Sequence, residues 1–224
     1  FTGGYMSLLR PAQFDSLMNV ISRRLTLSED VEIGGWLFPG SVDKTLMESF
    51  GRVNAGPLMF EVPSLLPEEC EKYKLPNTVT ALEHTVDYLR QTGFSNYGLR
   101  ILAGIPGRTL AAWGQIAEGI GRLEPAHLDF TIVDPAADNG QGFEVCLKKL
   151  EELGYRMYAP ICLTKAEKAP RYPEYRKKDA EYLGIGLAAE SRLDGFWSKN
   201  TGNVDLYLRE SSNYQRILAA AREL

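Results

Sequence analysis

The sequence has few of the residues that bind metals. Its 224 residues include three cysteines and two histidines. Cys70, Cys146 and Cys162 lie far apart, and no CxxC or CxxxCxxC spacing occurs. Zinc and iron-sulfur sites need several such ligands close together, so no metal site is predicted within this chain. The scattered thiols favour a reducing compartment, either the cytoplasm or the stroma or matrix of an organelle.

Long apolar runs and a dominant sign of charge are also missing. No run approaches the roughly 18 apolar residues that cross a bilayer, so no transmembrane segment is predicted. The 25 basic and 29 acidic residues are spread along the chain, and Lys and Arg do not alternate with aromatic residues. This pattern predicts no nucleic-acid partner. Neither a GxGxxG nor a GxxxxGK[ST] motif occurs, which leaves no dinucleotide or P-loop signature.

Short β-like runs alternate instead with helix-like apolar stripes. This alternation predicts strand-helix units around a parallel sheet. The clearest unit has a strand over 97–105, a Gly-Ile-Pro-Gly turn and a helix after Thr109. Further strands are predicted over 31–38, 58–62, 128–133 and 155–162, and helices from Pro11, over 43–52, 78–91 and 142–153, and from about Asn203. Periodicity alone allows a closed barrel or an open sheet.

Four segments resemble the motifs of one family, in the family's order. Residues 1–11, FTGGYMSLLRP, are similar to a segment of the form GGGTPTLLSP, and residues 102–109, LAGIPGRT, to a YGLPGQT turn. Residues 182–191, YLGIGLAAES, resemble a YLGFGAGAHS stretch, and residues 200–203, NTGN, an NTxN signal before a helix. The chain thereby resembles the oxygen-independent coproporphyrinogen III oxidase family (HemN/HemW) of radical SAM proteins. The resemblance covers roughly residues 1–208.

This resemblance implies an α/β fold: a partial (β/α)6 radical-SAM-type barrel, or incomplete TIM-like barrel. In the family, a [4Fe-4S] cluster and S-adenosylmethionine sit at the C-terminal ends of the strands. Phe1 aligns with the end of the family's second strand. We therefore expect the first strand, the CxxxCxxC loop that carries the cluster and most of the second strand to be missing. We expect residues 1–164 to form the barrel core and residues 165–224 a C-terminal family-specific segment packed on it.

The positions that hold S-adenosylmethionine in the family have changed. Gly3 and Gly4 are a remnant of the glycine-rich segment and the remaining candidates for cofactor binding. At the degenerate positions, the resemblance places Trp36 where the family has glutamate, Pro63 for glutamine, Leu75 for arginine and Arg100 for aspartate. Each lost hydrogen bond or ion pair costs on the order of 1–3 kcal/mol, so together the losses abolish useful affinity. We expect Trp36 to fill the vacated pocket; the alternative is an aromatic platform for another ligand.

Two classes of function follow from these residues. The first is a non-catalytic HemN-like protein that serves as a structural or interaction subunit, with no catalytic residue and no cofactor in this chain. The second is a fragment of a coproporphyrinogen III oxidase-like enzyme or a tetrapyrrole-handling haem chaperone, whose [4Fe-4S] segment lies upstream. Residues 31–38 would form an open strand edge. We therefore expect another polypeptide, a larger complex or an N-terminal extension to complete the barrel.

Overall fold

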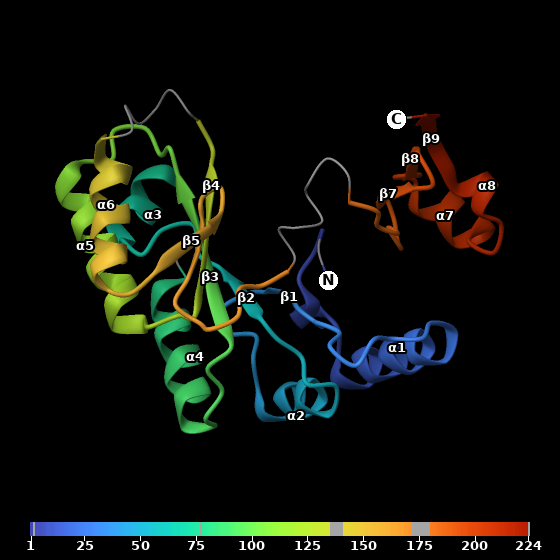
Figure 1. The fold of residues 1–224 in the computed structure, drawn as a ribbon, viewed down its shortest axis with the longest axis horizontal. Coiled ribbons are helices and arrows are strands. Elements are labelled where there is room, and N and C mark those ends of the chain that lie inside the picture. The colour runs from blue at the N-terminus through green and yellow to red at the C-terminus, as the bar shows by residue number, and fades with distance from the viewer. Residues whose placement is uncertain (2, 77, 135–140, 172–179, 224) are drawn as a thin grey trace. The chain divides into compact units, whose positions relative to one another are not determined.

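The apolar runs of the sequence form a six-stranded sheet in a computed structural model of the chain (Figure 1). The structure describes residues 1–224 except 2, 77, 135–140, 172–179 and 224. The strands lie in the order β1-β2-β3-β4-β6-β5. Their bounds are β1 Gly35–Leu37, β2 Leu58–Glu61, β3 Tyr97–Ala103, β4 His127–Ile132, β5 Arg156–Ala159 and β6 Cys162–Thr164. Strands β1 to β4 are parallel, as the strand-helix alternation predicts.

Helices lie between the parallel strands in the chain, and α3 to α6 cover one face of the sheet (Figure 1). The helices of this part of the chain are the 3₁₀ turn η1 Met6–Leu8, α1 Pro11–Arg24, α2 Lys44–Arg52, α3 Pro67–Tyr73, α4 Val79–Gln91, α5 Leu110–Leu123 and α6 Gln141–Glu152. Local chemistry fixes several starts. Proline occupies the first position of α1, and the side chains of Asp43 and Thr109 accept backbone N–H groups at the starts of α2 and α5.

The core lies between the sheet and these helices. Leu37, Phe60, Leu99 and Leu128 follow one another in register across the four parallel strands. Each is at most 1% exposed. On the helix side Trp113 of α5 is fully buried, and its ring contacts Phe130 and Phe143. Apolar burial on this scale is the main favourable contribution to folding.

Two predicted strands differ from the structure. The strand expected over 31–38 shrinks to β1, Gly35–Leu37. The single strand expected over 155–162 is wrong, because β5 and β6 form an antiparallel hairpin there, and β6 pairs antiparallel with β4. The hairpin turns at Pro160 and Ile161, where proline removes a backbone donor and Ile161 has a φ of 57°. Helix α3 was not predicted.

The chain's own first residues lie along the outer edge of β1. Tyr5 forms an isolated parallel bridge with Trp36, and the backbone N–H of Phe38 donates to the Ser7 hydroxyl over 3.2 Å. Part of the edge that the sequence predicted to be open is therefore covered by residues 5–7. Among the described residues, no helix is long and apolar enough to cross a membrane.

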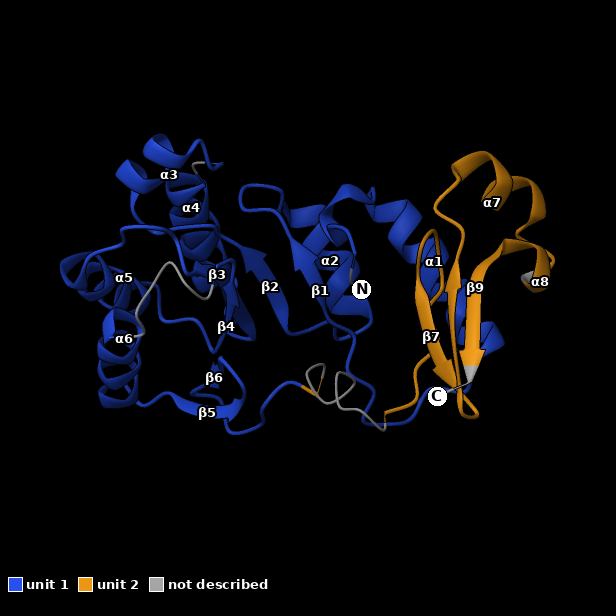
Figure 2. Ribbon diagram, turned by 90° about the horizontal axis from the view of Figure 1, so that it is seen from above, with its two compact units in different colours: residues 1–170 blue, residues 171–224 orange. Residues whose placement is uncertain are grey.

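Residues 171–224 form a second compact unit, drawn in orange in Figure 2. It contains a three-stranded antiparallel sheet in the order β7-β8-β9 and two short helices. Their bounds are β7 Glu190–Leu193, β8 Phe196–Asn200, α7 Val204–Glu210, α8 Tyr214–Ile217 and β9 Leu218–Glu223. The predicted C-terminal helix thus ends at Glu210, and the sheet was missed. This unit starts at Arg171. The expected division into a barrel core over 1–164 and a C-terminal family-specific segment over 165–224 stays a prediction.

Candidate functional site

The sheet face opposite the helices carries the chemistry of the first unit. Side chains alternate between the two faces of a strand, so the residues between the core positions point to this inner face. Glu61, Arg100, Asp129 and Cys162 lie in direct register there, on β2, β3, β4 and β6. Trp36 lies on the same face of β1, in register with Met59. The inner face is therefore a row of alternating charge beside an indole ring.

Arg100 joins these groups. Its Nε lies 3.4 Å from Oδ2 of Asp129, and its guanidinium stacks over the Trp36 ring at 4.1 Å from the ring centroid. Nε is buried and forms no hydrogen bond of good geometry, so the pair with Asp129 is electrostatic in character. Trp36 is only 7% exposed. A guanidinium held over an indole face is stabilised by the ring quadrupole.

The flanks of this row are also satisfied by the chain itself. Tyr5 hydrogen bonds to Glu61, and burial together with that carboxylate raises the pKa of the tyrosine. The Cys162 thiol donates to Oδ1 of Asp129 over 3.7 Å. Tyr158 hydrogen bonds to Cys162, and burial, with the nearby Cys162 and Asp129, raises the tyrosine pKa well above its usual range. Both phenols therefore stay protonated at neutral pH and act as donors.

The described residues do not fit the family's cofactors. The cysteines sit on three elements, α3, α6 and β6, and all are buried. Burial raises the pKa of Cys146 to about 12, and burial and Glu69 raise that of Cys70, whereas cluster ligands must be thiolates. No group of three or more His, Cys, Asp or Glu in the described ranges is placed to hold a metal ion. A sulfonium on the inner face would meet the cation of Arg100.

The six residues singled out from the sequence lie in different surroundings. Trp36 and Arg100 are in contact. Pro63 is half-buried after β2, where its carbonyl accepts the Leu102 N–H over 3.1 Å and so links the ends of β2 and β3. The others are Leu75, half-buried after α3, and Gly3 and Gly4, both exposed with open space around them.

A buried ion pair near the carboxyl ends of β2 and β3 was not predicted. Arg108 stands at the glutamine of the YGLPGQT turn, and its side chain is fully buried. It donates to the Glu69 carboxylate over 2.6 Å and to the Leu102 carbonyl over 2.7 Å. Ser64 also donates to Glu69, over 2.7 Å. Burial opposes ionisation of Glu69, but these hydrogen bonds outweigh it and lower the pKa.

Sequence reasoning also missed Glu61, Asp129 and Cys162. The usable signal was Asp129, a lone carboxylate inside the apolar strand 128–133. An ionised side chain in such a strand needs a partner, and Arg100 supplies it. Register across the sheet, which decides the partner, is not visible in the sequence.

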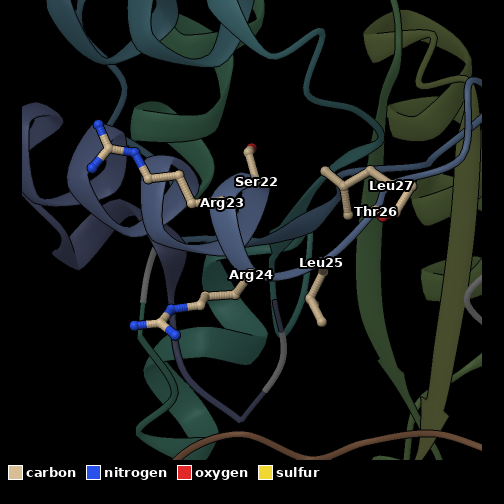
Figure 3. A pocket seen from close by; sticks show the side chains of 6 residues that line it. All are labelled: Ser22, Arg23, Arg24, Leu25, Thr26 and Leu27. Carbon is tan, nitrogen blue, oxygen red and sulfur yellow. The ribbon is translucent and has the colours of Figure 1, made fainter.

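A surface hollow at the end of α1 contains no inner-face residue. It is lined by six consecutive residues, Ser22 to Leu27. Figure 3 shows Arg23 and Arg24 pointing in different directions there, and the Ser22 hydroxyl donates to the Met18 carbonyl over 2.9 Å. The hollow therefore lacks convergent polar groups, which ligand sites require.

Comparison with known proteins supports the family resemblance. No family model matches the chain. The chain is 23% identical over 230 residues to the heme chaperone HemW of Bacillus subtilis, covering 92% of this chain and 60% of HemW. It is 22% identical over 234 residues to HemW of Lactococcus lactis, covering 96% of this chain and 62% of that protein. The chain thus spans about 60% of the length of these relatives.

The fold also matches a solved structure. The coproporphyrinogen III oxidase HemN of Escherichia coli, described as a radical SAM enzyme, superposes with a TM-score of 0.79 at 15% identity. The match covers 99% of this chain and 58% of HemN. At this identity the likeness establishes the fold. The predicted resemblance is confirmed: the chain is HemN/HemW-like in sequence and has the radical SAM fold of HemN.

Proposed function

We propose that this chain is a non-catalytic HemN-like protein that serves as a structural or interaction subunit. The observation that carries the proposal is the Trp36, Arg100 and Asp129 contact on the inner face. In this arrangement Arg100 forms an ion pair with Asp129, and the indole is covered by the chain's own guanidinium. Both the vacant pocket and the open aromatic platform are then replaced by internal packing.

Binding of S-adenosylmethionine tests this proposal. The full chain is titrated anaerobically with S-adenosylmethionine by calorimetry. We expect a dissociation constant weaker than about 100 μM, because the sulfonium would displace or approach the Arg100 cation. Tighter binding would contradict the proposal. An Arg100→Asp variant, which reverses the charge at that position, is the matched control, and any gain in affinity there identifies Arg100 as the excluding group.

The partner of such a subunit would complete the barrel beside β1. The six-stranded sheet ends at β1, whose outer edge is bridged by Tyr5. Another polypeptide, a larger complex or an N-terminal extension would cover this edge. Light scattering of residues 1–224 tests the proposal, because we expect self-association or aggregation of the chain in isolation. A monodisperse monomer of normal thermal stability would contradict it.

A haem chaperone, or a fragment of a larger enzyme, is the second candidate. The observation that favours it is that both curated relatives are named heme chaperones and extend beyond the aligned region. A [4Fe-4S] cluster and S-adenosylmethionine would then belong to a segment upstream. Haem titration distinguishes this candidate, since a Soret shift that saturates at one haem per chain supports it and an unchanged spectrum opposes it.

A further inference from the structure

The second unit places two arginines and two aromatic residues in one row across its sheet. Tyr182 bridges to Arg192, Arg192 pairs with Trp197, and Trp197 pairs with Arg222. Residues in direct register share a face and lie roughly 5 Å apart. We call these four residues the Trp197 row. Neighbouring members of the row are 5 to 25 positions apart in the sequence, so the sheet register brings them together.

Neighbouring groups hold the Trp197 ring in place. Glu190 accepts hydrogen bonds from Lys199, over 2.9 Å, and from the Trp197 side chain. The bond from Lys199 is the main cause of the lowered pKa of Glu190, so the acceptor stays ionised at neutral pH. Glu190 stands where the family motif has histidine. Arg222 stacks on the ring with its Cζ 5.1 Å from the centroid. Unlike Arg100 over the buried Trp36, Arg222 is exposed and Trp197 is half-buried, so a ligand ring can take the place of this guanidinium. The indole is thus oriented before any ligand arrives.

The row also carries two positive charges. Neither Arg192 nor Arg222 forms an ion pair with a carboxylate of the described residues, whereas Lys199 is paired with Glu190. The two guanidinium groups flank the ring from the neighbouring strands. The two arginines of the row are positive, whereas the chain as a whole has a net charge of −4. Arginine forks bind phosphate through two parallel hydrogen bonds.

We propose that the Trp197 row binds a planar ring that carries phosphate. Single-stranded nucleic acids and nucleotides share this chemistry: the ring stacks on an aromatic side chain and the phosphates pair with arginine. The sequence predicted no nucleic-acid partner because basic and aromatic residues do not alternate along the chain. They alternate across the sheet instead. The proposal concerns the second unit and is independent of the inner face, so either can fail alone.

Fluorescence polarisation of a labelled single strand of about ten nucleotides tests the proposal on the full chain. We expect a dissociation constant below about 100 μM, and a slope of log K against log salt of about −1.4 for two phosphate contacts. Arg192→Gln or Arg222→Gln should each weaken binding roughly tenfold and halve that slope. Trp197→Ala should weaken binding similarly, while Trp197→Phe should keep most of it, because the ring remains.

Arg209→Gln on α7 is the matched control, since it removes the same charge from an exposed residue of the same unit, outside the Trp197 row, that pairs with Glu210. It should change affinity less than twofold. If a mononucleotide competes with the labelled strand, a single nucleotide is sufficient for binding. If only an unlabelled oligonucleotide competes, the row binds single strands. Absence of binding, an equal loss in Arg209→Gln, or equal competition by inorganic phosphate would each overturn the proposal. Circular dichroism of each variant separates lost binding from lost folding.

Discussion

The two faces of the six-stranded sheet are built on different principles. The face toward the helices is apolar, with Leu37, Phe60 and Leu99 almost fully buried. On the inner face Arg100 lies in register between Glu61 and Asp129 and forms an ion pair with Asp129. Apolar burial is non-directional and tolerates the loss of a cofactor elsewhere, whereas a polar face needs each group to find a partner. The fold can thus persist while the chemistry of its inner face changes.

The largest expected effect is on the helix face. Phe60→Ala removes a fully buried ring from β2, where it contacts Tyr97. We expect the free energy of unfolding to fall by about 3–5 kcal/mol, because the cavity cannot be refilled by the flanking strands. Urea denaturation measures the change. A loss below about 1 kcal/mol would show that apolar burial on the helix face contributes no more to the free energy of unfolding than the polar contacts of the inner face do.

The buried ion pair near the carboxyl ends of β2 and β3, between Arg108 and Glu69, comes next. Arg108→Gln restores the family's residue but leaves Glu69 buried without its cation, so we expect a loss of about 3 kcal/mol. The double variant Arg108→Gln with Glu69→Gln removes the stranded charge and should recover part of that loss. Chemical denaturation of the two variants decides this. If Arg108→Gln alone leaves the free energy of unfolding unchanged, the pair does not stabilise the contact between α3 and the turn after β3.

Acid should lower the free energy of unfolding through His127, which lies on the inner face. Burial lowers the pKa of His127 from 6.5 to about 4, and its ring bonds to Thr164 and Asn96 over 3.0 and 2.9 Å. The unfolded chain therefore binds a proton at higher pH than the folded chain. The contribution of neutral His127 to the free energy of unfolding is complete above pH 6.5. It is lost as the pH falls toward 4, and the loss reaches about 3 kcal/mol.

The control for this pH dependence is His127→Gln, which has no titrating group at that position. Its unfolding free energy should fall less steeply between pH 6.5 and 4 than that of the unchanged chain. Thermal or urea unfolding across that range gives both curves. Parallel curves would contradict the account of a neutral, buried His127.

More of the helix face than of the inner face could be predicted from the sequence. The apolar periodicity of residues such as Trp113 and Leu99 predicted the strand-helix units, because burial leaves a direct trace in residue type. The partners of Arg100 and Asp129 depend on strand register, which leaves no such trace. In the second unit, Asp194 and Gly195, with φ values of 51° and 78°, form the turn of the missed hairpin. That Asp-Gly pair between apolar residues was the available signal.

The most direct test of the central claim, that Arg100 on the inner face is held by Trp36 and Asp129, is a double-mutant cycle. Trp36→Leu, Arg100→Gln and the combination are compared with the unchanged chain by urea denaturation. The account predicts a favourable coupling of about 1 kcal/mol between Trp36 and Arg100, as a desolvated guanidinium over an indole provides. A coupling indistinguishable from zero would contradict it, because Arg100 would then be free to meet a ligand.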